Sequence, residues 1–169
     1  KNEAVLPLST SQSIAVVGDL ADVPNLGDRG SSMVTSSEVT TPLAGLRAFG
    51  NQVDINYYAS DADLGGIGES DVAVVVVGLT YKEEGEFIPT QQQESDGSDL
   101  ARGGDRADLR LPESQEQLIL DIASKAKKTI VLLEGGSAIE VSTWVNEVDA
   151  LMMVWYPGRE GGHAIARVL

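Results

Sequence analysis

An acidic loop in the middle of the chain carries the residues whose types could do chemistry. Glu83, Glu84 and Glu86 fall within four positions, and Asp105 and Arg106 follow later in the same long loop. A carboxylic acid beside apolar surface, or beside other carboxylates, has a raised pKa and can act as a general acid near neutral pH. A charge run is also the usual signature of a solvated loop. The residues alone leave both interpretations open.

Two Asp-Arg steps accompany these glutamates. Asp28 and Arg29 follow the first expected strand, where they could contact a polar ligand or form an ion pair that shapes their own loop. Asp105 and Arg106 could orient the acidic loop, because an arginine near Glu84 would lower the pKa of its carboxyl group. Their alternative role is again an ion pair that only fixes the loop.

Strand patterns precede each of these loops. Short apolar runs predict buried strands at Ile14–Val17 and at residues 72–77, 129–133 and 151–155. Residues 53–57 alternate apolar and polar side chains, which predicts an edge strand with one wet face. Trp155 ends an apolar run, so we expect it in the core rather than stacked on a ligand.

Helix signals lie between the strands. Thr41-Pro42 predicts an N-cap followed by a first-turn proline, and Ser114 starts a stretch with capping-box spacing and one apolar face. Short helices are expected at residues 62–69 and 142–148. The alternation predicts an α/β fold, a mostly parallel open sheet flanked by helices on both faces in a three-layer α/β/α sandwich. Ligands of such sheets bind beyond the carboxyl ends of the strands, which is where the charged loops begin.

Composition excludes several classes of protein. The 169 residues suit one domain, and 12 basic against 26 acidic residues give a net charge of −14, which disfavours nucleic acid. No apolar run is long enough for a membrane span. With no cysteine and one histidine, we expect no disulfide, no metal and no cofactor.

Three other motifs fail on spacing. Residues 158–162 could seat a phosphate, but they lack the lysine of a P-loop and the dinucleotide-binding glycine pattern. Ser137, Asp149 and His163 have the chain order of a hydrolase triad, without the last glycine of the nucleophile elbow. Residues 61–63 begin like a calcium loop whose closing glutamate is missing.

A series of short motifs carries a family resemblance. They are Leu6-Pro7-Leu8, Ile14–Val17 with Gly18, Gly27-Asp28-Arg29-Gly30-Ser31, Val74 to Thr80, Glu84-Gly85-Glu86, Gly104-Asp105-Arg106, Leu111-Pro112, Gly135-Gly136-Ser137 and Trp155 to Gly162. In this order and spacing, along nearly the whole chain, the sequence resembles the second domain of family 3 glycoside hydrolases, the β-glucosidase group. No single motif is specific, but their order is.

The resemblance implies a site shared between two domains. Members of the family place an aspartate nucleophile on an N-terminal (β/α)8 barrel and commonly take the acid/base glutamate from the α/β sandwich domain. The Glu84-Gly85 step matches that glutamate, with Glu83 or Glu86 as alternatives if the register differs by one or two positions. Asp28, Arg29, Asp105 and Arg106 become expected substrate-binding or loop-orienting residues. The implied substrate is a β-linked oligosaccharide or glucoside.

This sequence departs from the family pattern in one respect: none of its residues resembles the barrel or its nucleophile motif. One carboxylate cannot perform a double displacement, so we expect residues 1–169, a single α/β sandwich domain, to be inactive without the barrel. The uncapped helical pattern at residues 163–169 also suggests a piece of a longer protein. The alternative is a non-catalytic carbohydrate-binding or docking module of the same fold. The composition fits periplasm, medium or cytoplasm, and we favour a periplasmic or secreted protein.

Overall fold

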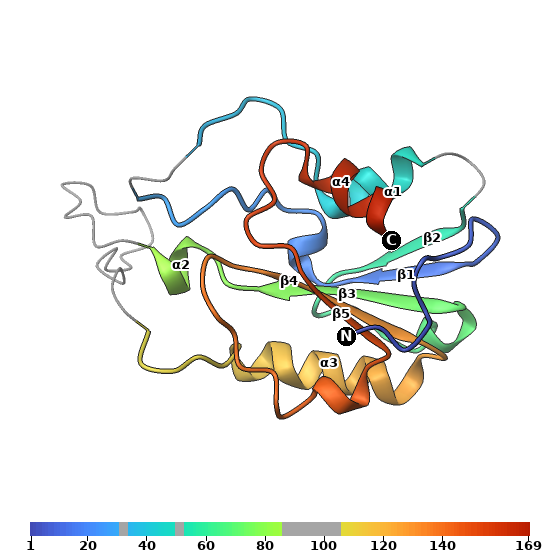
Figure 1. The fold of residues 1–169 in the computed structure, drawn as a ribbon. Coiled ribbons are helices and arrows are strands. Elements are labelled where there is room, and N and C mark those ends of the chain that lie inside the picture. The colour runs from blue at the N-terminus through green and yellow to red at the C-terminus, as the bar shows by residue number, and fades with distance from the viewer. Residues whose placement is uncertain (31–33, 50–52, 86–105) are drawn as a thin grey trace.

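Five parallel strands form one open sheet at the centre of the fold (Figure 1). The computed structural model describes residues 1–30, 34–49, 53–85 and 106–169. The strands are β1 (Ile14–Val17), β2 (Ile55–Tyr58), β3 (Val72–Gly78), β4 (Thr129–Glu134) and β5 (Ala150–Met153). Their order in the sheet is β2-β1-β3-β4-β5, so the chain turns to the opposite side after β2. The predicted fold class is confirmed.

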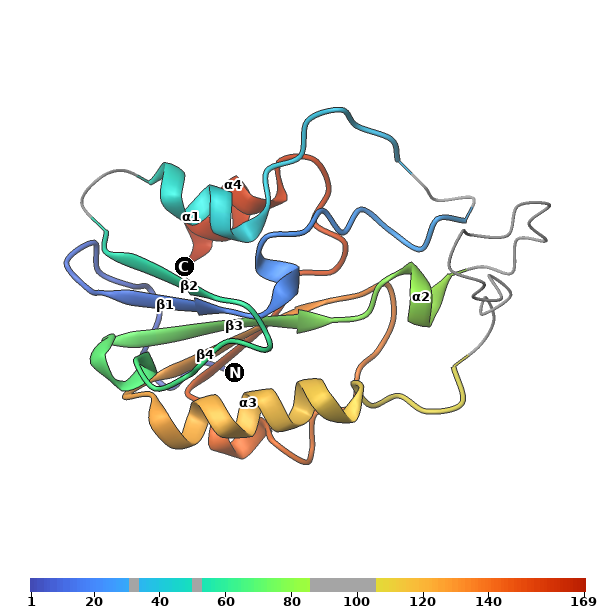
Figure 2. The same ribbon diagram turned by 180° about the vertical axis from the view of Figure 1, so that it is seen from behind.

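Helices cover both faces of the sheet. α1 (Pro42–Ala48) and α4 (Gly161–Val168) lie on one face, and α3 (Glu113–Lys125) lies on the other (Figures 1 and 2). Thr41 caps α1 as predicted, because its side chain accepts a hydrogen bond of 3.2 Å from the amide of Ala44. The capping box expected at Ser114 is wrong, since α3 begins one residue earlier, after Pro112, and has no side-chain cap.

Four short elements complete the described chain. They are α2 (Tyr81–Glu84) and the 3-10 turns η1 (Asp19–Ala21), η2 (Ile67–Glu69) and η3 (Val145–Glu147). The helices expected at residues 62–69 and 142–148 are therefore reduced to single 3-10 turns. α2 directly follows β3 and lies beyond its carboxyl end (Figure 1).

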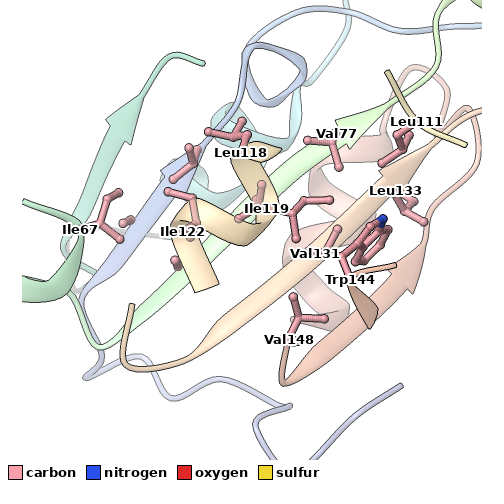
Figure 3. Packing of buried hydrophobic residues seen from close by; sticks show 14 of the residues in the cluster. Ile67, Val77, Leu111, Leu118, Ile119, Ile122, Val131, Leu133, Trp144 and Val148 are labelled. Carbon is pink, nitrogen blue, oxygen red and sulfur yellow. The ribbon is translucent and has the colours of Figure 1, made fainter. Parts of the chain in front are cut away.

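The strands divide the core into two clusters by their alternating side chains. Along β3, Val75 and Val77 pack toward α3, where Ile119 and Trp144 are fully buried (Figure 3). Val74 lies in the cluster on the α1 and α4 face. β3 is buried at every position because both of its faces are covered, which explains its continuous apolar sequence.

Two glycines let α1 and α4 approach each other at backbone contact. A Cβ atom on Gly162 would lie 2.0 Å from the carbonyl oxygen of Thr41, and one on Gly45 would lie 2.0 Å from the carbonyl oxygen of Gly162. No real Cβ sits that close to a backbone atom, so glycine is required at both positions. This contact fixes how α4 lies over the sheet.

The first residues of the chain cover the outer edge of β5. The amide of Leu151 donates to the carbonyl of Lys1 over 3.0 Å, and the amide of Glu3 donates to the carbonyl of Asp149 over 2.9 Å. Asn2 forms an antiparallel bridge with Ala150. Residues 1–3 thus occupy hydrogen-bonding groups that an edge strand leaves open.

Candidate functional site

The loops that leave β3, β4 and β5 meet around one carboxylate at the carboxyl edge of the sheet. Glu84 ends α2, Gly136 and Ser137 follow β4, and Tyr156 follows β5. Parallel strands bring these loops to the same edge, as the sequence predicts. The side chain of Glu84 is only 7% exposed.

Glu84 accepts hydrogen bonds from three directions. The amide of Gly136 donates to Oε2 over 2.6 Å, and the hydroxyl of Tyr156 donates to the same oxygen over 2.7 Å. The hydroxyl of Ser137 is hydrogen-bonded to Oε1. A Cβ at Gly136 would lie 2.8 Å from the ring of Tyr156, so glycine is needed for the phenol to reach Glu84. The carboxylate is therefore oriented by two other loops.

Arg106 adds a positive charge to this cluster. Its Nε lies 3.7 Å from Oε1 of Glu84, and its Nη2 donates to Ser137 Oγ and to the carbonyl of Ala138, each over 2.6 Å. Arg106 thus links the segment before α3 to the loop after β4. Asp105, the other residue of this expected pair, lies outside the described residues.

Glu83 makes different contacts from Glu84 and caps the helix α2. Its Oε2 accepts hydrogen bonds of 2.8 Å from both the amide and the hydroxyl of Thr80, while Thr80 caps α2 in return. This reciprocal pattern is a capping box, which stabilises the first turn of a helix. Glu83 therefore holds α2 in place, while Glu84 turns toward β4 and β5. Glu86 lies outside the described residues.

The pKa of Glu84 is lowered, which is the direction expected from a nearby arginine and opposite to the one expected from neighbouring glutamates. Burial raises the pKa of this carboxyl, but the hydrogen bonds from Gly136, Ser137 and Tyr156 and the charge of Arg106 outweigh burial and leave it below its ordinary value. Burial and the bond to Glu84 raise the pKa of Tyr156. Repulsion among neighbouring glutamates was expected to raise the pKa of Glu84, but the hydrogen-bond donors around its carboxylate determine the direction instead. In this domain Glu84 is a carboxylate at neutral pH.

Asp28 and Arg29 lie beside α2. The guanidinium carbon of Arg29 sits 3.3 Å from the centre of the Tyr81 ring, a cation–π contact with the first residue of α2. Asp28 accepts a hydrogen bond of 2.8 Å from the amide of Gly30. The Asp28-Arg29 loop thus packs against the helix that carries Glu84.

A cavity of about 810 Å³ opens beside this loop. It is lined by residues that include Asn25, Arg29, Thr80, Tyr81 and Gln115. Its place, between the loops after β1 and β3, is where the strand order reverses and where sheets of this type bind ligands. Glu84 is not among its lining residues, although the three preceding residues of α2, Tyr81 to Glu83, are.

The prediction that Trp155 is a core residue is wrong. Its side chain is 55% exposed, and its φ of 58° is in the left-handed region that bulky residues rarely adopt. This backbone conformation costs about 1–2 kcal/mol. Because the indole is exposed, the fold also lacks the few kcal/mol of stabilisation that full burial of an indole would contribute. Trp144, in contrast, is completely buried.

A second carboxyl group, Glu134, lies deep beneath the same edge. It is 1% exposed and accepts a hydrogen bond of 3.0 Å from the side-chain amide of Asn25. Burial raises its pKa to about 8, so it is largely protonated at neutral pH. The sequence places Glu134 and Tyr156 at this rim but assigns neither of them a role. Their positions at the ends of two apolar runs were the available signal.

The rejected triad residues lie in separate environments. Ser137 is bonded to Glu84, Asp149 accepts from Lys128 over 2.7 Å, and His163 pairs with Glu160 over 2.9 Å. Within residues 1–30, 34–49, 53–85 and 106–169, no group of acidic or histidine side chains is arranged to hold a metal ion. Over the same ranges no helix has the length and apolar character needed to cross a membrane.

Comparisons with known proteins agree on one family. The family profile described as "Glycosyl hydrolase family 3 C-terminal domain" matches residues 1–169. Thermostable beta-glucosidase B of Acetivibrio thermocellus is 31% identical over the whole chain, and a xylan 1,4-beta-xylosidase of Xylanibacter ruminicola is 31% identical over 70% of it. The chain spans 22% of the first enzyme and 13% of the second. A beta-glucosidase structure from Bifidobacterium adolescentis superposes with a TM-score of 0.72 at 28% identity, covering 99% of this chain and 24% of that one.

Proposed function

Because the chain belongs to the C-terminal domain family of glycosyl hydrolase family 3, we propose that it is one half of a retaining, β-glucosidase-type active site. Glu84 is the general acid/base in this proposal, and an N-terminal (β/α)8 barrel supplies the nucleophile. The substrate is a terminal β-linked sugar of an oligosaccharide or glucoside. The similarity to enzymes named beta-glucosidase and xylan 1,4-beta-xylosidase supports this class of reaction.

One observation carries the assignment of Glu84. Its carboxylate is held by groups from two other loops, Gly136 and Ser137 on one side and Tyr156 on the other. A group that transfers a proton must keep its position relative to the bond that breaks, and such anchoring provides it. Glu83, the neighbouring alternative, is engaged with Thr80 in the cap of α2.

The reaction would use Glu84 twice. As an acid it donates its proton to the glycosidic oxygen while the barrel aspartate bonds to the sugar and the leaving group departs. As a base it then takes a proton from the water that releases the sugar. The low pKa of Glu84 in this domain suits the second step. For the first step the pKa must rise, and a second carboxylate about 5–5.5 Å away, as in retaining enzymes, acts in that direction.

The expected supporting residues fall into two groups in this proposal. Arg106 orients Glu84 through its contacts with Ser137 and Ala138. Arg29 supports α2 through Tyr81 and lines the cavity, where we assign it a contact with sugar hydroxyl groups. Asp28 keeps its expected substrate-binding or loop-orienting role as a prediction from sequence. Asp105 keeps its expected loop-orienting role as a prediction from sequence.

The kinetic test compares two neighbouring substitutions in the full-length protein. Glu84→Gln should slow hydrolysis of a β-linked disaccharide by at least about a hundredfold, because a poor leaving group needs the proton. An aryl glucoside with a good leaving group should be affected far less in its first step, and azide should restore turnover. Glu83→Gln removes the same charge one residue away and keeps an acceptor for Thr80, so it serves as the control.

Equal behaviour of the two variants on both substrates would contradict the role of Glu84. A second measurement addresses the barrel. The chain alone should not hydrolyse an aryl β-glucoside, and addition of the barrel domain should produce activity. Activity of the chain alone would overturn the two-domain proposal.

The second candidate is a non-catalytic carbohydrate-binding module. The depressed pKa of Glu84 and its full set of hydrogen-bond donors favour it, because both also describe a carboxylate that only ties loops together. In that case Glu84→Gln would lower the stability of the domain and leave the ratio of rates on the two substrates unchanged.

A further inference from the structure

We propose that Trp155 is a sugar-binding residue whose indole stacks on the ring of the leaving-group sugar. The inference rests on the proposed glycosidase function and adds a binding residue to it. Three features support it: the conformation that exposes the indole, the anchoring of the backbone on either side, and the adjacency to Tyr156 and Glu84.

The conformation of Trp155 removes its side chain from the core. Along β5 the side chains alternate, with Met153 packed in the cluster on the α3 face and Val154 in the cluster on the α1 and α4 face. Continued alternation would send Trp155 toward α3. Its φ of 58° interrupts the alternation instead, and the indole is 55% exposed. Strained non-glycine residues of this kind concentrate at ligand-binding sites.

The backbone around Trp155 is held on both sides. The amide of Val154 donates to Leu133 over 2.8 Å, and the carbonyl of Trp155 accepts from Gly135 over 3.3 Å. The next residue, Tyr156, donates to Glu84 over 2.7 Å. The exposed indole is therefore attached to the same framework that orients the proposed proton donor.

The chemistry of the side chain points to a sugar. The apolar face of an indole packs against the C–H face of a pyranose ring, and such aromatic contacts strengthen binding without requiring charge. A neutral sugar is also unaffected by the strong negative charge of this chain. Since Glu84 would touch the glycosidic oxygen, the surface next to its anchor faces the leaving group.

Fluorine NMR of the full-length protein labelled with 5-fluorotryptophan tests the contact directly. The Trp155→Phe variant identifies the resonance of Trp155 by its loss, and Trp144→Phe identifies the buried reference. Titration of a non-hydrolysed thio-linked β-disaccharide should shift the Trp155 resonance and protect it from a soluble paramagnetic agent. The Trp144 resonance should not move.

Kinetics provide the second readout. Trp155→Ala should raise KM for a β-linked disaccharide about tenfold and leave kcat nearly unchanged, and Trp155→Phe should recover most of the loss. KM for a methyl β-glucoside, which has no ring in the leaving group, should not change. Equal changes for both substrates would overturn the leaving-group assignment.

Failure of this inference is distinct from failure of the proposed function. A Trp155 resonance insensitive both to sugar and to the paramagnetic agent would mean that another part of the protein covers the indole, which overturns the inference. The Glu84→Gln test would still stand in that case. The opposite result is also distinguishable. If Glu84→Gln did not slow disaccharide hydrolysis but the Trp155 resonance still responded to sugar, only the acid/base role of Glu84 would be contradicted.

Discussion

The hydroxyl of Tyr156 donates a 2.7 Å hydrogen bond to Oε2 of Glu84 from 72 residues further along the chain. This bond joins the end of β5 to the end of α2, across the intervening loop of β4. Because it is made to the charged form of Glu84, it favours the carboxylate over the acid. Tyr156 therefore influences both the position and the protonation of the proposed acid/base.

Replacement of Tyr156 by phenylalanine should raise the pKa of Glu84, since a donor to the carboxylate is lost. The general acid is active while protonated, so the basic limb of the kcat/KM profile should move to higher pH. Tyr58→Phe on β2 is the control, because it removes a phenol hydroxyl without touching Glu84. A shift of the basic limb to lower pH would contradict this role of Tyr156.

Glu134 should make the folded state less stable as pH rises. Its pKa is about 8 in the fold and 4.5 as an ordinary group, so between these values the folded state binds the extra proton. Stability from this group is complete below pH 4.5 and is lost as pH rises toward 8. Glu134→Gln should remove this decline. At pH 8 the free energy of unfolding of the variant should exceed that of the parent by at least about 1 kcal/mol.

Urea unfolding at several pH values measures the effect of Glu134→Gln. Glu140→Gln is a matched control because Glu140 is exposed. A parent and variant whose unfolding free energies run parallel with pH would show that Glu134 is ionised in the fold.

Gly162→Ala should destabilise the domain by about 2–3 kcal/mol or more, because the added Cβ would meet the backbone of Thr41 at 2.0 Å. α1 and α4 would have to separate to make room. Ala164→Ser on the exposed side of α4 should cost about 0.5 kcal/mol through helix propensity alone. Thermal unfolding of the two variants gives the comparison, and equal melting temperatures would refute the close contact.

Arg110→Met should lower the stability of the domain more than Lys127→Met does. Arg110 pairs with Glu116, whose side chain is 7% exposed, whereas Lys127 pairs with Asp71, whose side chain is 46% exposed. Loss of Arg110 leaves a buried carboxylate short of a partner, which should cost about 1–3 kcal/mol. The exposed pair should contribute less than about 1 kcal/mol. Chemical denaturation distinguishes them, and similar losses would contradict the difference in burial.

The strands were predictable because their apolar runs report burial on both faces. β1 has the predicted bounds, and β3 and β4 each extend by one residue. β5 stops at Met153, earlier than its apolar run, because Trp155 adopts a left-handed conformation that hydrophobicity does not encode. Local periodicity thus locates elements better than it locates their ends.

The family, the loop of Glu84 and the arginine beside it also followed from the sequence, but the hydrogen-bond donors to Glu84 did not. Tyr156 and Ser137 meet it only when distant parts of the chain fold together, and they lie 72 and 53 residues away. The direction of the Glu84 pKa depends on these donors. For the same reason, the neighbouring Glu83 could be separated from Glu84 only by seeing its bond to Thr80.

The pairing of residues 1–3 with β5 has a consequence for how separate molecules behave toward one another. These residues occupy main-chain groups of Leu151 and Asp149 that would otherwise face solvent. A molecule without them would offer a bare strand to which another copy could add its own, and so on along a growing stack. Residues 1–3 thus leave fewer main-chain groups at this edge of β5 for a strand of another molecule to pair with.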